Sequence, residues 1–240
     1  MSLKDKIKYW RDFSCLKKQA KISPENFPFA KRYPCLKDWR SSSGDASGHY
    51  FHQDLFIAQK ILEANPVKHV DVGSRVDGFV AHVATYREIE VFDVRPQKNE
   101  VKNIIFKQAD FMAEDFALNN YCDSISSLHA IEHFGLGRYG DPVNYDGHLI
   151  GLKNIHATLK ENGIFYFSVP IGPQRIEFNA HRIFSLQYRI DILKDKFTTT
   201  SFSFVDDQGD FHYDVDLTPD NVATNFSCHY GCGIFILRKK

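Results

Sequence analysis

The sequence has no long hydrophobic run. No stretch approaches the roughly eighteen consecutive apolar residues that a membrane-spanning helix requires. The first residues also carry too many charges for a secretory signal peptide. We therefore expect a soluble, cytoplasmic protein.

Cysteine is scarce and unpaired. The chain has 5 cysteines, an odd number, and no C-x-x-C motif, which suits free thiols in a reducing compartment. Cys228 and Cys232 flank His229 in C-H-Y-G-C, a spacing that admits a metal site. Because no second cysteine pair accompanies them, we interpret both as buried small hydrophobic residues.

Net charge is also absent, but the charges are unevenly placed. Residues 1–40 hold eleven Lys and Arg against four acids. Leu3, Ile7, Trp10, Phe13 and Leu16 recur at helical spacing, which predicts an amphipathic helix with a basic outer face. That face is either simply solvated or a surface that docks peripherally on anionic lipid or an acidic partner. We predict a basic helical extension and lid over 1–48 and one α/β domain over 49–240.

The rest of the chain is organised around residues 68–96. A short apolar run ends at Gly73, a helix-compatible segment follows, and an alternating run ends at Asp93. This order predicts a strand, a tight turn, a helix and a second strand, which together form a βαβ unit. Gly73 lets a ligand approach the backbone, and Asp93 is placed to accept hydrogen bonds from both hydroxyls of a ribose.

The turn lacks the glycine patterns that hold phosphates. Gly73 and Gly78 match G-x-x-x-x-G, but Phe79 and Val80 stand where a P-loop needs Lys and Ser or Thr. No G-x-G-x-x-G occurs at this turn, so the sequence indicates no pyrophosphate-binding site at the helix N-terminus. A nucleoside without phosphates is the favoured ligand, and an NAD-dependent oxidoreductase is the weaker alternative.

Asp71, Gly73 and Asp93 resemble motif I and the following strand of class I S-adenosylmethionine-dependent methyltransferases. Arg75 and Asp77 stand where that motif has its second and third glycines. The resemblance implies a single doubly wound, mainly parallel seven-stranded sheet with an antiparallel C-terminal hairpin. It also implies S-adenosylmethionine as cofactor, bound by residues at the strand ends: Asp71, Gly73, Ser74, Arg75, Asp93, Val94, Asp110, Phe111 and Leu128.

Further elements follow from periodicity and turn residues. A helix is expected over 49–64, where His49 and His52 are interpreted as satisfied at its start rather than as site residues. A second helix over 149–160 is expected to stop at Glu161, Asn162 and Gly163. The remaining strands are expected over 104–107, 124–128, 164–169, 197–205, 211–217 and 233–237, with 197–205 and 211–217 forming the hairpin.

The fourth strand leads into S-L-H-A-I-E-H-F, where chemistry-bearing residues gather. If this turn is helical, His129, Glu132 and His133 lie on one face. The I-E-H run resembles that of many class I methyltransferases; in ubiquinone-pathway and small-RNA O-methyltransferases a longer E-x-x-E-H form with a later histidine binds a divalent cation. Here His129 replaces the first glutamate and His181 is the later histidine. We therefore favour catalytic acid/base roles for His133, Glu132, His129 and His181, and a metal is not predicted.

Residues 135–140 spell G-x-G-x-x-G, but they follow no strand directly and run into Pro142. We interpret them as a mobile loop whose Arg138 and Tyr139 contact the acceptor, or as a purely structural loop. Together with G-H-Y-F-H-Q-D-L and C-G-I-F-I-L-R-K, this region resembles a domain-of-unknown-function family assigned to the methyltransferase superfamily. That resemblance covers residues 48–240.

The sequence thus predicts an S-adenosylmethionine-dependent methyltransferase that acts on an oxygen of a small molecule or sugar. His133, oriented by Glu132 or His181, is the expected base. A non-catalytic binding module is the alternative from another class, because Arg75 and Asp77 are large enough to fill the methionine pocket. Nucleic acid is disfavoured as substrate, since the chain beyond the extension is acidic and lacks an aromatic and basic stripe.

Overall fold

The computed structural model describes residues 2–240. It divides into two compact units, one ending at Ala46 and the other beginning at Ser47. No helix within the described residues is long and apolar enough to cross a membrane. Each unit is considered separately below.

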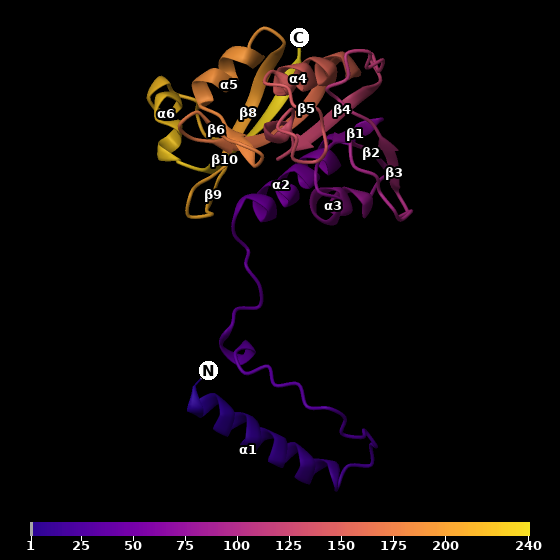
Figure 1. Ribbon diagram of the computed structural model, residues 1–240, viewed down its shortest axis with the longest axis vertical. Helices are drawn as coiled ribbons and strands as arrows, with labels where there is room; N and C mark the ends of the chain where they lie inside the picture. Colours follow the sequence, from indigo (N-terminus) through magenta and orange to yellow (C-terminus); the bar gives the residue numbers. More distant parts are fainter. Residues whose placement is uncertain (1) are drawn as a thin grey trace. The chain divides into compact units, whose positions relative to one another are not determined.

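The first unit is built on α1 (Leu3–Ala20), the helix that the sequence predicts (Figure 1). Its start is a capping box, in which the side chains of Ser2 and Asp5 each accept a hydrogen bond from the backbone of the other. A short 3-10 turn, η1 (Asp38–Arg40), supplies the Arg40 guanidinium, which pairs with Asp5 at 2.5 Å. These local contacts stabilise the N-terminal end of the helix.

The second unit contains one eight-stranded sheet and a two-stranded ribbon. The sheet order is β3-β2-β1-β4-β5-β10-β8-β9, and β6 pairs with β7 in the ribbon. Strands β1 to β5 pair in parallel, while β10 is antiparallel to both of its neighbours. The strands are β1 (His69–Val72), β2 (Ile89–Asp93), β3 (Ile104–Gln108), β4 (Cys122–Leu128), β5 (Leu159–Ile171), β6 (Arg175–Glu177), β7 (His181–Ile183), β8 (Phe197–Val205), β9 (Phe211–His212) and β10 (Gly231–Lys239).

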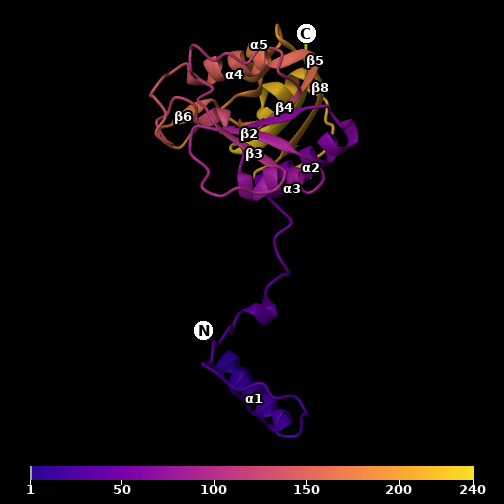
Figure 2. The ribbon, with the colours of Figure 1, turned by 90° about the vertical axis from the view of Figure 1, so that its right-hand side faces the viewer.

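Helices cover both faces of the sheet, with α2 and α3 on one side and α4 and α5 on the other (Figure 2). Ile57 and Ile61 of α2 are fully buried in one apolar cluster, and Ile155 of α4 is fully buried in the other. Because both faces are covered, the central strand β1 is buried along its whole length. The helices and turns are α2 (His49–Ala64), η2 (Val76–Val80), α3 (Ala81–Ala84), η3 (Ile131–His133), α4 (Gly147–Thr158), α5 (Leu186–Leu193), α6 (Pro219–Ala223) and η4 (Asn225–Ser227).

The predicted α/β architecture is therefore confirmed, with the last strand inserted beside the fifth. The hairpin is shorter than expected, because β9 ends at His212 rather than at Leu217. Asp214 adopts a left-handed conformation with φ of 42°, which interrupts the regular ladder, although the Val215 N–H still donates to the Phe202 carbonyl of β8 at 2.9 Å. The sheet thus consists of seven longer strands and the two-residue strand β9 at its edge.

The end of α4 also differs from the prediction. The helix ends at Thr158, and Leu159 already has extended backbone angles and pairs with Cys122 of β4. Asn162, with φ of 60°, occupies a turn inside β5 rather than a helix stop. Pairing with β4 therefore overrides the local stop signal.

Candidate functional site

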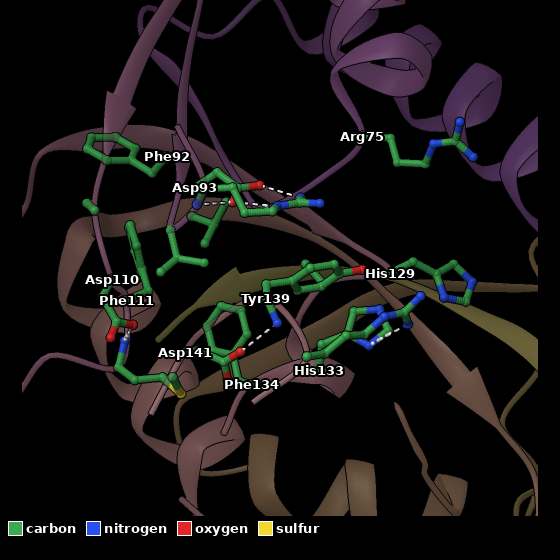
Figure 3. Close-up of a pocket in the computed structure, with 18 of the residues that line it drawn as sticks. Arg75, Phe92, Asp93, Asp110, Phe111, His129, His133, Phe134, Tyr139 and Asp141 are labelled. Atoms are coloured by element: carbon green, nitrogen blue, oxygen red, sulfur yellow. Dashed lines mark hydrogen bonds and ion pairs between the residues drawn. The ribbon is translucent and has the colours of Figure 1, made fainter. Parts of the chain in front are cut away.

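A cavity of about 290 Å³ opens beyond the carboxyl ends of the parallel strands (Figure 3). Ligands of open α/β sheets bind in this position. Six of the nine predicted cofactor residues line it: Gly73, Arg75, Asp93, Val94, Asp110 and Phe111. Of the four predicted catalytic residues, His129 and His133 line it.

Gly73 forms the bare turn after β1. Its φ is 74°, a left-handed conformation that favours glycine. A side chain added there would begin 3.0 Å from the Cβ atom of Ala130, which follows β4. The main chain at Gly73 is thus packed closely against the neighbouring turn while it lines the cavity.

Asp71, Ser74 and Leu128 lie beneath the cavity instead of lining it, and all three are buried. The Asp71 carboxylate accepts hydrogen bonds from the Ser74 backbone at 3.0 Å and from the hydroxyls of Ser74 and Ser126, each at 2.6 Å. Burial raises the pKa of Asp71 to about 7. The Leu128 backbone in turn donates to the Ser74 hydroxyl at 3.0 Å. These residues shape the turn that holds Gly73.

Asp93, at the tip of β2, is engaged by Arg95. Its Oδ1 atom accepts from the Arg95 backbone at 2.8 Å and from Nε at 3.0 Å, and Oδ2 accepts from Nη2 at 2.6 Å. The Arg95 guanidinium also lies 4.2 Å from the ring centre of Tyr139. Asp93 thus faces the cavity with part of its accepting capacity already used.

Arg75 does not fill the cavity. Its side chain is 55% exposed, and its guanidinium pairs with Asp77 at 2.9 Å. Figure 3 shows Arg75 at one edge, well away from Asp93. At the other end of the site, the Asp110 carboxylate accepts from the Met112 backbone at 2.7 Å.

His129, Glu132 and His133 meet, but not on a helix. His129 is left-handed, with φ of 49°, and precedes the single 3-10 turn η3. Its backbone N–H donates to the Ser168 carbonyl of β5 at 3.1 Å, which holds it at the strand end. The expected i, i+3, i+4 helical face is therefore wrong, although His129 Nδ1 still reaches the Glu132 carboxylate at 2.7 Å.

Glu132 is buried between the two histidines. Its Oε1 atom lies 2.7 Å from His129 Nδ1 and 3.8 Å from His133 Nε2, while Oε2 has no hydrogen-bond partner. Burial alone would raise the pKa of Glu132, but the charges of both histidines outweigh it and hold that pKa below its ordinary value. Burial likewise opposes a charge on His129, yet Cys232 and Glu132 outweigh it and raise the pKa of His129 well above the ordinary value.

His133 is held in one tautomer. Its Nδ1 atom lies 2.6 Å from the Ala180 carbonyl, which can only accept, so Nδ1 carries the proton. Burial lowers the pKa of His133 against the opposing charge of Glu132. The imidazole is therefore disposed to be neutral, with the lone pair on Nε2.

His181 belongs to a different group. It lies on β7, outside the cavity lining, and its Nε2 atom pairs with Glu177 at 3.1 Å. Its ring centre is 6.4 Å from that of His133. Among the described residues, His129, Glu132, His133 and His181 do not form a metal-binding group, so the divalent cation suggested by the E-x-x-E-H resemblance is not supported.

The loop over residues 135–140 is anchored rather than free. The Asp141 carboxylate accepts backbone hydrogen bonds from Gly135 at 2.9 Å, Gly137 at 3.3 Å and Tyr139 at 3.1 Å. Arg138 and Tyr139 line the cavity, and their contact with an acceptor stays a prediction. The mobile loop predicted there is thus tethered at its centre.

Several cavity residues were not predicted, among them Tyr50, Phe92, Arg95, Met112 and Phe134. Arg95 had a sequence signal, because it follows Asp93 by two positions in D-V-R. Tyr50 had none, since nothing in the order of elements places the start of α2 beside the end of β4. Its ring centre lies 5.3 Å from that of His129.

Comparison with known families gives one match. A sequence model of the family described as "Caenorhabditis protein of unknown function, DUF268" matches residues 78–239, which is more than half of the chain. No curated protein matches the chain in sequence.

Solved structures share the fold at low sequence identity. The 1,6-didemethyltoxoflavin-N1-methyltransferase of Burkholderia thailandensis has a TM-score of 0.55 and 17% identity, covering 78% of each chain. N-methyltransferase NodS of Bradyrhizobium japonicum has a TM-score of 0.53 and 12% identity, covering 88% of this chain and 93% of its own. The [4+2]-cyclase SpnF has a TM-score of 0.53 and 13% identity, covering 82% and 85%. The chain therefore has the class I methyltransferase fold.

Proposed function

We propose that this chain, which belongs to the DUF268 family, is a methyltransferase that uses S-adenosylmethionine to methylate an oxygen of a small molecule or sugar. The observation that carries the proposal is the pairing of a bare turn at Gly73 with a carboxylate at Asp93 across one cavity. Two solved structures of the same fold contain S-adenosylhomocysteine according to their titles. The fold itself supports other chemistry, as the cyclase illustrates.

The cavity residues fit the adenosine part of the cofactor. Gly73 presents bare main chain to the cavity, in a left-handed turn that packs against Ala130. Asp93 retains an accepting position on Oδ2 for a ribose hydroxyl, since a carboxylate has about four such positions and Arg95 takes three. Phe92 and Phe111, with ring centres 5.6 Å apart, supply apolar surface. Asp110 also lines the cavity, and we assign its carboxylate to the adenine amino group, as the methyltransferase resemblance implies.

The bound cofactor would supply an electrophilic methyl group on a sulfonium. The protein then mainly has to align the acceptor oxygen with that methyl group and exclude water. His133 is placed to take the proton from the acceptor, because Nδ1 is anchored to Ala180 and Nε2 is free to accept. Arg138 donates to the same Ala180 carbonyl at 3.0 Å and lines the cavity, where its guanidinium can orient a polar acceptor.

The two alternatives from the sequence have less support. A non-catalytic module was suggested because Arg75 could fill the methionine pocket, but Arg75 points outward to Asp77. A dinucleotide would need room for a pyrophosphate at the turn after β1, and the glycine pattern for that is missing.

Isothermal titration with S-adenosylhomocysteine tests the cofactor assignment. We expect saturable binding at one molecule per chain, whereas absence of binding would refute the proposal. Incubation with methyl-labelled S-adenosylmethionine and extract fractions should then label a small-molecule fraction. Titration with NADH, followed by its fluorescence, should give no change, and a clear change would favour the oxidoreductase instead.

A further inference from the structure

Two histidines and a cysteine from distant parts of the second unit converge beside the cavity. His49 opens α2, His129 follows β4, and Cys232 lies near the start of β10. One donor atom from each lies within 4.8 Å of the donor atoms of the other two. This is the one such group of three His, Cys, Asp or Glu residues that the structure brings together within residues 2–240.

The free nitrogen of His129 is the atom that needs explanation. The side chain is only 4% exposed, and its Nδ1 atom is engaged by Glu132. Its Nε2 atom is buried without any hydrogen-bond partner. An unpaired buried nitrogen is costly, and such groups in native proteins usually have a ligand or a water.

We propose that His49, His129 and Cys232 bind a Zn²⁺ ion through two imidazole nitrogens and one thiolate. The donor set decides the metal class, because thiolate and imidazole suit Zn²⁺, whereas Mg²⁺ and Ca²⁺ require oxygen ligands. Neither this ion nor this ligand set was foreseen from the sequence, where His49 was interpreted as a satisfied helix-start residue.

Glu132 has the role of an outer-shell carboxylate in this site. Histidines that bind metals almost always donate their other ring N–H to a carboxylate or carbonyl, which fixes the tautomer. The contact from His129 Nδ1 to Glu132 Oε1, at 2.7 Å, has this geometry and leaves Nε2 as the ligand atom. The two negative charges, on the thiolate and on buried Glu132, would be balanced by the divalent ion.

The three donor atoms, within 4.8 Å of one another, are close enough to share one ion after small side-chain adjustments. Tetrahedral Zn²⁺ with bonds of about 2.0 to 2.3 Å holds its ligands roughly 3.5 Å apart. His49 is only half-buried and lies at a helix start, so its side chain has freedom to close the gap. In the metal-free form the Cys232 thiol donates to Gln53 Oε1 at 3.5 Å. On metal binding the thiol proton and the proton on His129 Nε2 are both released to solvent.

Three protein ligands leave one position open, as in catalytic zinc sites. Because His129 also lines the cavity, we assign that position to the acceptor oxygen or to a water. This role rests on the proposed methyl transfer, but the binding of the ion does not. The two ideas are therefore tested by different measurements.

The test uses the full chain in a Cys15→Ser/Cys35→Ser background, which removes the two exposed thiols. After equilibration with zinc and dialysis, elemental analysis should give one Zn²⁺ per chain. Titration with Co²⁺ should give a thiolate-to-cobalt charge-transfer band in the near ultraviolet and the intense visible bands of a tetrahedral ion. A background protein that binds neither ion would overturn the proposal, whatever its affinity for S-adenosylhomocysteine.

Variants assign the ligands. Cys232→Ser should remove the charge-transfer band, and the matched control Cys122→Ser, at a buried cysteine in β4, should retain it. Glu132→Gln should weaken Zn²⁺ binding about 10- to 100-fold, and His49→Ala should weaken it further. Because His49 is only half-buried, His49→Ala should fold, and it tests the site even if Cys232→Ser misfolds. Unchanged metal binding by folded His49→Ala would also overturn the site.

Discussion

The Arg95 guanidinium forms a bidentate ion pair with the carboxylate of Asp93, two positions earlier in the chain. Nε lies 3.0 Å from Oδ1, and Nη2 lies 2.6 Å from Oδ2. The same carboxylate is the proposed acceptor for the ribose hydroxyls. A bidentate guanidinium contact is strong and directional. The nucleoside must therefore share Asp93 with Arg95 or displace it.

Replacing Asp93 should weaken cofactor binding more than any other single change at the strand ends. In Asp93→Ala the ribose loses its charged acceptor, and hydrogen bonds to charged groups contribute about 1.5 to 3 kcal/mol, or roughly 10- to 100-fold in affinity. Isothermal titration with S-adenosylhomocysteine measures the loss. Asp77→Ala, at a 75% exposed acid of the turn after β1, is the control. Equal losses in both variants would remove Asp93 from the proposed site.

Arg95→Met should have the opposite effect. It frees Asp93 from a competing donor and keeps a long side chain over Tyr139, so affinity for S-adenosylhomocysteine should rise about two- to tenfold, the net value of one ordinary hydrogen bond. Arg175→Met removes an arginine from an equally spaced pair outside the cavity, Arg175 with Glu177 at 2.9 Å, and should leave affinity unchanged. Weaker binding by Arg95→Met would mean that Arg95 itself contacts the cofactor.

Gly73→Ala tests the bare turn. A non-glycine residue in the left-handed region costs about 1 to 2 kcal/mol of folding free energy, and here the added Cβ also meets Ala130 at 3.0 Å. Gly140→Ala has a similar φ, 83°, with nothing within 4 Å of the new atom. Urea unfolding should show both variants destabilised, and titration should show a larger loss of S-adenosylhomocysteine affinity for Gly73→Ala. Comparable affinities would indicate that the turn does not touch the ligand.

The βαβ core could be predicted because the sequence signals for its strands and turn lie within one continuous stretch. Alternation, a glycine at the turn and an acid at the next strand tip are visible in one stretch, and they correctly placed Gly73 and Asp93 on the same cavity. The end of α4 was missed because Leu159 pairs with Cys122, which lies in a strand distant in sequence. Local stop signals carry no information about such pairing.

The convergence of His49, His129 and Cys232 could not be predicted for the same reason. It depends on β10 inserting beside β5 and on α2 starting near the end of β4. The left-handed conformation of His129 is fixed by Ser168, whose carbonyl and hydroxyl accept from its backbone at 3.1 and 3.2 Å. A helical pattern in the sequence is therefore misleading at this position.

Buried His69 should make stability depend on pH. Its ring lies between the hydroxyls of Ser124 at 2.7 Å and Ser126 at 3.2 Å, and burial lowers the pKa of His69 to about 3. Between pH 6.5 and 3, His69 is protonated in the unfolded chain but neutral in the folded protein. The free energy of unfolding therefore falls as the pH falls. The difference is about 1.4 kcal/mol per pH unit, or about 2 kcal/mol between pH 6.5 and 5.

Urea unfolding of wild-type protein and His69→Gln at several pH values isolates this effect. Asp71, whose pKa is raised to about 7, contributes the opposite trend to both proteins, so the comparison concerns the difference between them. The wild-type protein should lose stability more steeply than His69→Gln below pH 6.5. His229→Gln, at an exposed histidine, should follow the wild type. Parallel curves for wild type and His69→Gln would show that His69 is protonated in the folded state.

His133→Ala should slow methyl transfer strongly while leaving the cofactor site intact. General base catalysis contributes about 10²- to 10⁴-fold, and the His133 lone pair on Nε2 is the proposed base. Label transfer from S-adenosylmethionine to the active extract fraction should fall by that factor, with affinity for S-adenosylhomocysteine nearly unchanged. Because His133 must be neutral to act, wild-type turnover should fall with falling pH. The residual turnover of His133→Ala should not show this decline. The control His181→Ala, at a residue outside the cavity lining, should retain turnover. An equal loss of turnover in His181→Ala, or a loss of cofactor affinity in His133→Ala, would show that His133 is not the base.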